Sequence, residues 1–221
     1  MLKTGGKVST TNDPTIISDE IIVVYDMDDV LWGYTEVAAR HAGINFEHWT
    51  DFHVEEIMEL SEAERKAVRA VIGRSDYYEE IEFYPGVEEI FRPCSLSERV
   101  RVQINSNVVS EEAREIKIRR LRQVLPNLAD DDVVFGLVQC GKPKSTLKKR
   151  IDPRTYIFID DSPYNIAGSP AKINLMPTRP WNTSKSAKRV LANSQPTFAP
   201  DLKSINQLVY DLVQQQLALS S

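Results

Sequence analysis

The chain has little of what marks a secreted, zinc-binding or membrane-spanning protein. Its 221 residues include only two cysteines, Cys94 and Cys140, and their spacing fits neither a disulfide framework nor a zinc site. No run of about eighteen apolar residues occurs, and the first residues contain no apolar segment of the kind that a signal peptide carries. We therefore expect a cytoplasmic protein with no membrane partner.

Basic residues are too few for a protein that binds a polyanion over a large surface. Lysine and arginine number 27 against 32 aspartates and glutamates, which gives a formal net charge of −5. This balance argues against a nucleic-acid polymer or an anionic membrane as the main partner. A single phosphate group can still bind, because a metal ion and a few cations can be placed locally around it.

The most informative stretch is residues 21–32, which read I-I-V-V-Y-D-M-D-D-V-L-W. Its first five residues are apolar and mostly β-branched, which is typical of a strand buried on both faces of a parallel sheet. Asp26, Asp28 and Asp29 follow at the edge where such sheets bind ligands. Two carboxylates this close stay together if a cation lies between them or if one is protonated. The alternative is a loop in which the aspartates only form a turn.

Strand and helix patterns alternate along the rest of the chain, which predicts an α/β fold with a parallel sheet. The region 33–83 is the exception, because it contains helical patterns at 35–42, 55–60 and 61–72 and no convincing strand. We therefore expect a helical cap at 33–83, inserted after the first strand, a core at 21–32 and 84–221, and a flexible lead-in at 1–20. Further strands are expected at 100–104, 133–138, 156–159 and 173–176, and helices from 87, at 111–125, 146–150, around 187 and at 201–217.

Polar side chains follow four of the expected strands, and all four strand ends meet at one edge of a parallel sheet. Their residue types suit phosphoryl transfer: a carboxylate pair, a hydroxyl with an amide, a lysine and a second carboxylate pair. The set comprises Asp26 and Asp28, Ser106 and Asn107, Lys142 or Lys144, and Asp160 and Asp161.

The order of these motifs resembles the haloacid dehalogenase superfamily, whose members are mostly phosphatases. The matching segments read V-V-Y-D-M-D-D-V-L, Q-I-N-S-N, G-K-P-K-S and I-F-I-D-D, and the resemblance covers residues 21–176. It implies a Rossmann-like core with a small cap. One departure is Asp29, which stands where the family most often has glycine.

The resemblance implies a Mg²⁺-dependent phosphomonoester hydrolase with an aspartyl-phosphate intermediate. Asp26 would attack phosphorus, and Asp28 would protonate the leaving oxygen and then activate water. The carboxylate of Asp26, the backbone carbonyl of Asp28 and a carboxylate of the Asp160/Asp161 pair would hold the metal. The family usually uses the second residue of that pair, Asp161.

The phosphate itself would be bound by Ser106, by Asn107 at the neighbouring position, and by a lysine. Two lysines compete for that last role. The segment G-K-P favours Lys142, whereas a lysine followed by serine at a helix start favours Lys144, which we prefer.

Aromatic residues in the expected cap give a narrower resemblance, to the 5′(3′)-deoxyribonucleotidases. The segments D-M-D-D-V-L-W-G-Y and Y-Y-E-E-I-E-F-Y-P-G have aromatics where that family packs rings against the nucleobase. The candidate substrate-binding residues are Trp32, Tyr34, Tyr77 and Tyr78. The alternative is that these rings only pack the cap against the core.

Other basic and titratable residues are interpreted as structural. The histidines His41, His48 and His53 form no metal motif, so we expect surface or packing roles for them. The basic helix over 114–122 is interpreted as a solvated face with isoleucines and a leucine turned inward. Competing functions are a phosphatase of another small metabolite, such as a sugar phosphate, and a non-catalytic module that accepts or binds a phosphoryl group.

Overall fold

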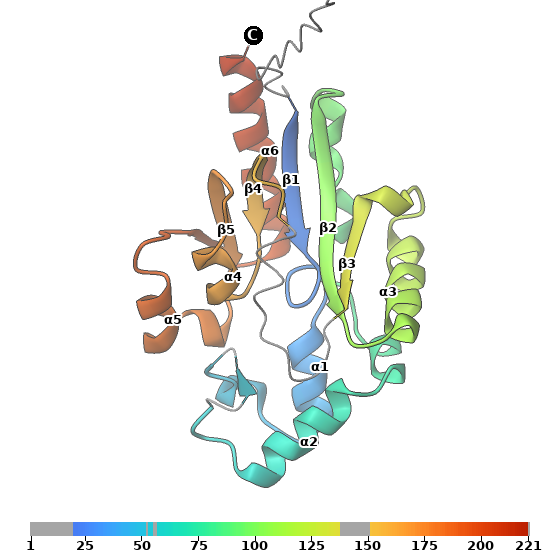
Figure 1. Ribbon diagram of the computed structural model, residues 1–221, viewed down its shortest axis with the longest axis vertical. Helices are drawn as coiled ribbons and strands as arrows, with labels where there is room; N and C mark the ends of the chain where they lie inside the picture. The colour runs from blue at the N-terminus through green and yellow to red at the C-terminus, as the bar shows by residue number, and fades with distance from the viewer. Residues whose placement is uncertain (1–19, 52, 55–56, 138–150, 221) are drawn as a thin grey trace, which may run out of the picture.

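The fold is a parallel β-sheet with helices on both faces and a helical segment beyond the carboxyl ends of the strands (Figure 1). The computed structural model describes residues 20–51, 53–54, 57–137 and 151–220. All strand pairings in it are parallel, and the strand order is β3-β2-β1-β4-β5-β6. The strands are β1 (Ile21–Asp26), β2 (Val100–Val108), β3 (Val133–Leu137), β4 (Thr155–Ile159), β5 (Ile173–Pro177) and β6 (Thr197–Ala199). The predicted α/β class and parallel sheet are confirmed.

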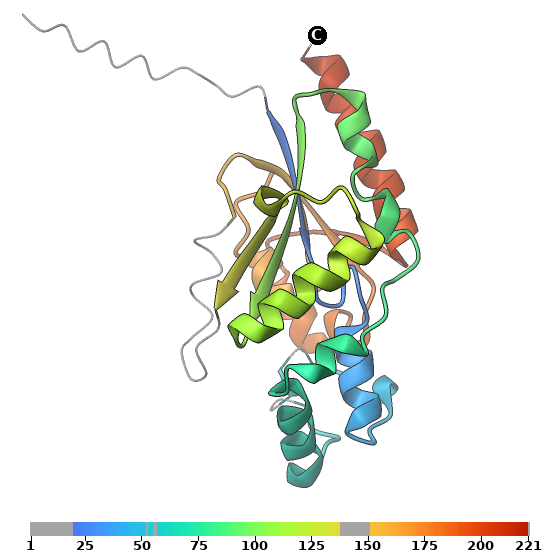
Figure 2. The same cartoon turned by 90° about the vertical axis from the view of Figure 1, so that its right-hand side faces the viewer.

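Strand β1 lies at the centre of the sheet and is buried on both faces. Val23 and Tyr25 belong to the larger core, which includes residues of α3 (Glu111–Val124) and α6 (Leu202–Leu219). Ile22 and Val24 point to the other face, into a smaller core with residues from α4 (Pro163–Ala167) and from the end of α5 (Lys185–Val190). Figure 2 shows α3 and α6 on the same side of the sheet. This two-sided burial explains the unbroken apolar run of residues 21–25.

The segment between β1 and β2 is helical and lies beyond the carboxyl ends of the strands (Figures 1 and 2). It contains α1 (Tyr34–His41), η1 (Phe46–His48), α2 (Glu62–Ile72) and η3 (Asp76–Glu79). The chain enters and leaves it through a two-stranded junction, in which Trp32 bridges to Phe83 and the Tyr84 amide donates to the Leu31 carbonyl at 2.8 Å. The division into core and cap stays a prediction.

Most expected elements are present, with a few corrections. Residues 57–60 form a turn and not the end of a helix, because the Ile57 carbonyl accepts hydrogen bonds from the Leu60 amide and from Arg65. The segment from Val87 folds as two 3₁₀-helices, η4 (Val87–Glu89) and η5 (Arg92–Leu96). Strand β2 runs on to Val108, and β6 was not expected. The remaining short helices are η6 (Asp130–Asp132) and η8 (Pro180–Asn182).

Some expectations fall outside the described residues. They concern the lead-in up to residue 19, Lys142 and Lys144, and the helix over 146–150. Within the described part of the chain, no helix has the length and apolar character needed to cross a membrane.

A buried hydrogen-bond chain ties the central strand to α6. The Tyr25 hydroxyl donates to Asn206 Oδ1 at 3.1 Å, and Asn206 Nδ2 donates to the Gly86 carbonyl at 2.8 Å. Gly86 has a φ of +103°, so glycine suits this turn. All three groups are shielded from water, and an unpaired member would be costly.

Replacing Asn206 by leucine should therefore lower the free energy of unfolding by about 1–3 kcal/mol, since two buried polar groups lose their partner. In a chain of this length each kcal/mol lowers Tm by about 2–4 °C. Thermal and denaturant unfolding would measure the change. The matched control is Gln207→Leu on the exposed side of the same helix. Equal stability of the two variants would contradict the role of this chain.

Candidate active site

The carboxyl ends of β1, β2 and β4 bring the predicted polar residues together. Asp26 is aligned with Asn105 of β2, and Tyr25 is aligned with Ile159 of β4. The residues that follow these positions, Ser106 on one side and Asp160 on the other, therefore flank the end of the central strand. The parallel register predicted from the sequence produces this proximity.

Three carboxylates form the centre of the site. Asp26, Asp160 and Asp161 each offer an oxygen, and these oxygens all lie within 4.8 Å of one another. Neutral donors hold two of them in place. Ser162 N donates to Asp160 Oδ1 at 2.7 Å, Asn165 Nδ2 donates to Asp160 Oδ2 at 2.9 Å, and Trp181 Nε1 donates to Asp161 Oδ2 at 2.8 Å.

The electrostatics of this cluster favour a bound cation. Burial, followed by repulsion from Asp160, Asp28 and Asp161, raises the pKa of Asp26 well above its usual range. Burial and repulsion from Asp29 and Asp160 likewise raise the pKa of Asp161. Three clustered carboxylates supply the hard oxygen ligands that Mg²⁺ prefers. The residues present therefore fit a divalent metal ion, and Asp26, Asp160 and Asp161 are the side chains that would hold it.

Asp29 occupies a strained turn next to this cluster. Its φ is +58°, in the left-handed region that glycine, asparagine and aspartate adopt most readily. The buried carboxylate accepts from Thr35 N at 2.8 Å and from the Thr35 hydroxyl, and the Asp29 carbonyl accepts from Arg179 Nη2 at 2.7 Å. Burial raises the pKa of Asp29 to about 7, although Thr35 and Arg179 oppose the shift. This turn accounts for an aspartate where the resembling family most often has glycine.

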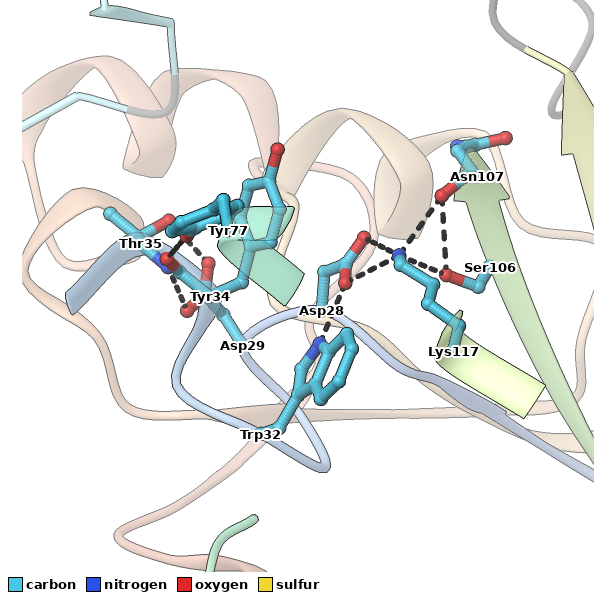
Figure 3. A network of polar contacts seen from close by, with 9 residues as sticks. All are labelled: Asp28, Asp29, Trp32, Tyr34, Thr35, Tyr77, Ser106, Asn107 and Lys117. Atoms are coloured by element: carbon cyan, nitrogen blue, oxygen red, sulfur yellow. Dashed lines mark hydrogen bonds and ion pairs between the residues drawn. The ribbon is translucent and has the colours of Figure 1, made fainter. Parts of the chain in front are cut away.

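Asp28 lies outside the three-carboxylate cluster and contacts a lysine that the sequence analysis did not select. Lys117 Nζ lies 2.7 Å from both Asp28 Oδ1 and Oδ2, and the Ser106 hydroxyl oxygen lies 2.8 Å away (Figure 3). The Asn107 carbonyl accepts from the same Nζ at 3.0 Å. The side chain of Lys117 has no exposed surface. The interpretation of 114–122 as a solvated basic face is therefore wrong for this residue.

Helix geometry explains why this lysine is buried. Ala113, Lys117 and Leu121 are spaced four residues apart on α3, and all three are buried. Residues at this spacing share one face of a helix. The signal was therefore present in the sequence as a lysine on the apolar stripe, next to Ile116.

Aromatic rings surround the buried ammonium group. Lys117 Nζ lies 5.5 Å from the ring centre of Trp32, 5.8 Å from Tyr34 and 5.1 Å from Tyr78. Such contacts help to offset the desolvation of a cation. Trp32 Nε1 also donates to Asp28 Oδ1 at 2.7 Å.

The four aromatic residues predicted to bind substrate occupy different places. Tyr34 and Tyr78 line a pocket at the active site, whereas Trp32 and Tyr77 are not among its described lining residues. Trp32, Tyr77 and Tyr78 are almost fully buried, and the Tyr77 hydroxyl donates to the Tyr34 carbonyl. Packing accounts for Trp32 and Tyr77, while substrate contact by any of the four stays a prediction.

The pocket has a volume of about 320 Å³ and lies between the carboxylates and the helical segment. Its polar end includes Asp26, Asp28 and Asp161, and its opposite wall is largely apolar. His53, for which a surface or packing role was expected, is one of its lining residues. The lining residues for which the sequence predicted no role in substrate binding or catalysis are Asp29, Thr35, Trp49, His53, Val54, Ile72, Val108, Val109, Asn165 and Trp181.

The loop after β5 supports the carboxylates from the side. Arg179 holds the carbonyl of Asp29, and Trp181 holds the carboxylate of Asp161, as described above. Asn182 Nδ2 donates to the Asp161 carbonyl at 3.2 Å and to the Pro177 carbonyl at 2.7 Å. The sequence provides no physical account of the roles of these residues, because their partners lie far away along the chain.

Comparison with known proteins supports the fold. The sequence matches no family model, and no curated protein matches it. Among solved structures, a candidate β-phosphoglucomutase from Bacteroides vulgatus superposes with a TM-score of 0.53 at 16% identity, covering 90% of this chain and 91% of that one. A haloacid dehalogenase-like hydrolase from Streptococcus pneumoniae gives 0.51 at 15% identity over 88% and 100%. A candidate β-phosphoglucomutase from Thermotoga maritima gives 0.50 at 18% over 87% and 99%.

These likenesses show that the chain has the fold of haloacid dehalogenase-like proteins, as its motifs predicted. At identities of this size they carry the fold and not the activity. The narrower resemblance to 5′(3′)-deoxyribonucleotidases stays a prediction.

The raised pKa values predict how stability depends on pH without metal. Asp29 titrates near 7 in the folded protein against an ordinary value of 3.8, and the pKa values of Asp26 and Asp161 are raised as well. The folded state therefore binds protons more tightly than the unfolded chain, so this contribution to stability is lost as pH rises from about 4 to about 7. In EDTA, Tm should fall over this range, and Mg²⁺ should restore it most at the upper end.

The variant Asp26→Asn tests the repulsion among the clustered carboxylates, because it removes one negative charge from the cluster. In EDTA at neutral pH it should melt above the parent, and its stabilisation by Mg²⁺ should shrink. Asp211→Asn, at an exposed position on α6, is the matched control. An Asp26→Asn protein that is less stable than the parent in EDTA would show that the carboxylates do not repel one another.

Proposed function

We propose that the protein is a Mg²⁺-dependent phosphomonoester hydrolase that acts through an aspartyl-phosphate on Asp26. The observation that supports this most directly is the position of Asp26. It ends the central strand inside a cluster of carboxylates, faces a pocket, and has a second carboxylate, Asp28, two residues away. The haloacid dehalogenase-like fold is consistent with this activity.

The chemistry follows from the two aspartates. An oxygen of Asp26 attacks phosphorus while the bond to the ester oxygen breaks, and Asp28 gives its proton to the departing alcohol. Water then attacks the phosphorus of the aspartyl-phosphate and loses a proton to Asp28, which releases inorganic phosphate and regenerates Asp26. Bound Mg²⁺ would supply positive charge that stabilises the phosphoryl oxygens.

The phosphate oxygens need donors as well as the metal. Ser106, at the end of β2, lies beside Asp28 through their shared contact with Lys117. We assign phosphate binding to Ser106 and Asn107, as the motif suggested. The roles of Lys142 and Lys144 in the same step stay proposals.

We further propose that the substrates are nucleoside or deoxynucleoside monophosphates. Beyond the carboxylates the pocket wall is formed by Tyr34, Trp49, Ile72, Tyr78 and Val109, which suit a flat, weakly polar group such as a nucleobase.

The first test is phosphate release from a panel of nucleotides and sugar phosphates, with Mg²⁺ and with EDTA. We expect release that requires Mg²⁺ and prefers deoxynucleoside or nucleoside monophosphates. Asp26→Asn should abolish turnover because the nucleophile is lost, while Asp211→Asn should keep it.

The other outcomes separate the alternatives. Metal-dependent release without a preference for nucleotides would retain the phosphatase and remove the nucleotidase. No release from any substrate would favour a module that binds or accepts a phosphoryl group. Activity of Asp26→Asn near the parent rate would remove Asp26 as the nucleophile.

The aromatic wall gives a prediction about specificity. Trp49→Ala should raise KM for nucleoside monophosphates about 5- to 150-fold, since stacking of a base on an aromatic ring contributes about 1–3 kcal/mol. Hydrolysis of a small phosphate ester without a base should change little. Phe91→Ala, at a partly buried aromatic position that is not among the described pocket residues, is the control. Equal effects on both substrates would assign Trp49 to packing alone.

A further inference from the structure

Lys117 is the most unusual residue that the proposed chemistry does not yet use. A fully buried lysine is costly unless its ammonium group is paired and hydrogen-bonded. Here Nζ lies within hydrogen-bonding distance of both oxygens of Asp28, the hydroxyl oxygen of Ser106 and the carbonyl of Asn107. Two of these partners, Asp28 and Ser106, are the proposed acid–base group and a proposed phosphate ligand.

We infer that Lys117 is the positioning residue that orients Asp28 and Ser106 for proton transfer and phosphate binding. The inference rests on the proposed function. It assigns to α3 a role in the reaction that was not expected from the sequence.

The contacts of Asp28 select which of its oxygens exchanges the proton. Oδ1 accepts from both Trp32 Nε1 and Lys117 Nζ, which uses both of its lone-pair positions. Oδ2 accepts from Lys117, and the structure gives it no other bond to a described residue. Since Asp28 lines the pocket, Oδ2 is the oxygen that keeps a lone pair for a proton. Lys117 and Trp32 together fix the carboxylate so that this oxygen does not rotate away.

The contact with Ser106 also sets the direction of a hydrogen bond. An ammonium group has only donors, so the Ser106 oxygen must accept from Lys117. Lys117 therefore restricts where the hydroxyl hydrogen of Ser106 can point, and one acceptor for it is the Asn107 carbonyl at 3.4 Å. Ser106 is almost fully buried, and its neighbour Asn107 lines the pocket. In the proposed function, Lys117 thus sets the direction of the hydroxyl that would bind phosphate together with Asn107.

The surroundings of Lys117 hold the ammonium group where it is. Its chain lies on the buried face of α3, and the rings of Trp32, Tyr34 and Tyr78 enclose Nζ. A lysine with all its hydrogens engaged and no exposed surface does not reach into the pocket itself. It therefore acts on the reaction through Asp28 and Ser106.

The experiment measures how rate depends on the leaving group. Substituted phenyl phosphates differ in the acidity of the departing phenol but little in shape. A well-placed general acid helps poor leaving groups most, so kcat/KM of the parent should depend weakly on phenol pKa. Without orientation of Asp28 the dependence should steepen. For Lys117→Met we expect kcat/KM to fall about tenfold more for phenyl phosphate than for p-nitrophenyl phosphate, within the range that general acids contribute.

Two variants serve as references for this slope. Asp28→Asn removes the acid and should show the steepest dependence, and Trp32→Phe removes one of the bonds to Oδ1 and should steepen the slope partly. Lys188→Met, the same substitution at an exposed site on α5, should match the parent. Circular dichroism and thermal unfolding check each fold. Should Lys117→Met fail to fold, Lys117→Arg, which keeps the charge and displaces the donors, should give the steeper slope.

Each outcome decides between the proposals. A Lys117 variant that slows all phenyl phosphates by the same factor, or not at all, overturns the positioning role and leaves the phosphatase proposal intact. A parent protein that releases phosphate from none of the esters, with Mg²⁺ present, overturns the proposed function and the role of Lys117 with it. A steeper slope for Lys117→Met and a parent-like slope for Lys188→Met support the inference.

Discussion

Electrostatic repulsion among carboxylates at the edge of the sheet is the constraint on which the rest of the site depends. The parallel register places the ends of β1 and β4 side by side, so Asp26 meets Asp160 and Asp161 within 4.8 Å. Burial and neighbouring carboxylates disfavour the anionic forms of Asp26 and Asp161. Neutral amide, indole and backbone N–H groups donate to Asp160 and Asp161 and orient them, and the charge of Arg179 offsets only part of the shift in the pKa of Asp161. The cluster thus keeps the negative charge that attracts a divalent cation.

The positive charge of Lys117 goes to a different carboxylate. The residue pairs with Asp28, which lies outside the cluster, and aromatic rings lie around its ammonium group. A lysine paired with Asp26 would compete with a metal ion and would weaken the nucleophile. Asp26 lies among carboxylates that raise its pKa, a shift that the charge of Lys117 opposes only in part, whereas Asp28 is paired directly with the ammonium group. Two aspartates only two residues apart thus have different neighbours, which suits different roles in one reaction.

The sequence predicted the parts of this arrangement that depend on local patterns. The apolar run before Asp26 predicted the central strand, and polar residues after successive strands predicted the site edge and the fold. Lys117 was missed because a basic helix was judged by its overall charge, although the 113–117–121 spacing placed the lysine among buried residues. Trp49 and His53 could not be found in this way. They reach the pocket from loops and short helices whose positions depend on tertiary packing.

The difference between local sequence patterns and tertiary packing also explains what could be predicted about the aromatic residues. The sequence predicted Trp32 and Tyr34 near the site but could not give the directions of their rings. Trp32 points inward, donates to Asp28 and bridges to Phe83 at the junction through which the chain enters and leaves the helical segment. Trp32 thus contacts both the proposed general acid, Asp28, and the junction through which the chain enters and leaves the helical segment. That segment contributes to the apolar wall of the pocket. Because the buried indole donates to Asp28 while the backbone of the same residue bridges to Phe83, a shift of that junction would also move the donor that fixes Asp28. The position of the helical segment and the orientation of the acid are therefore mechanically linked through Trp32.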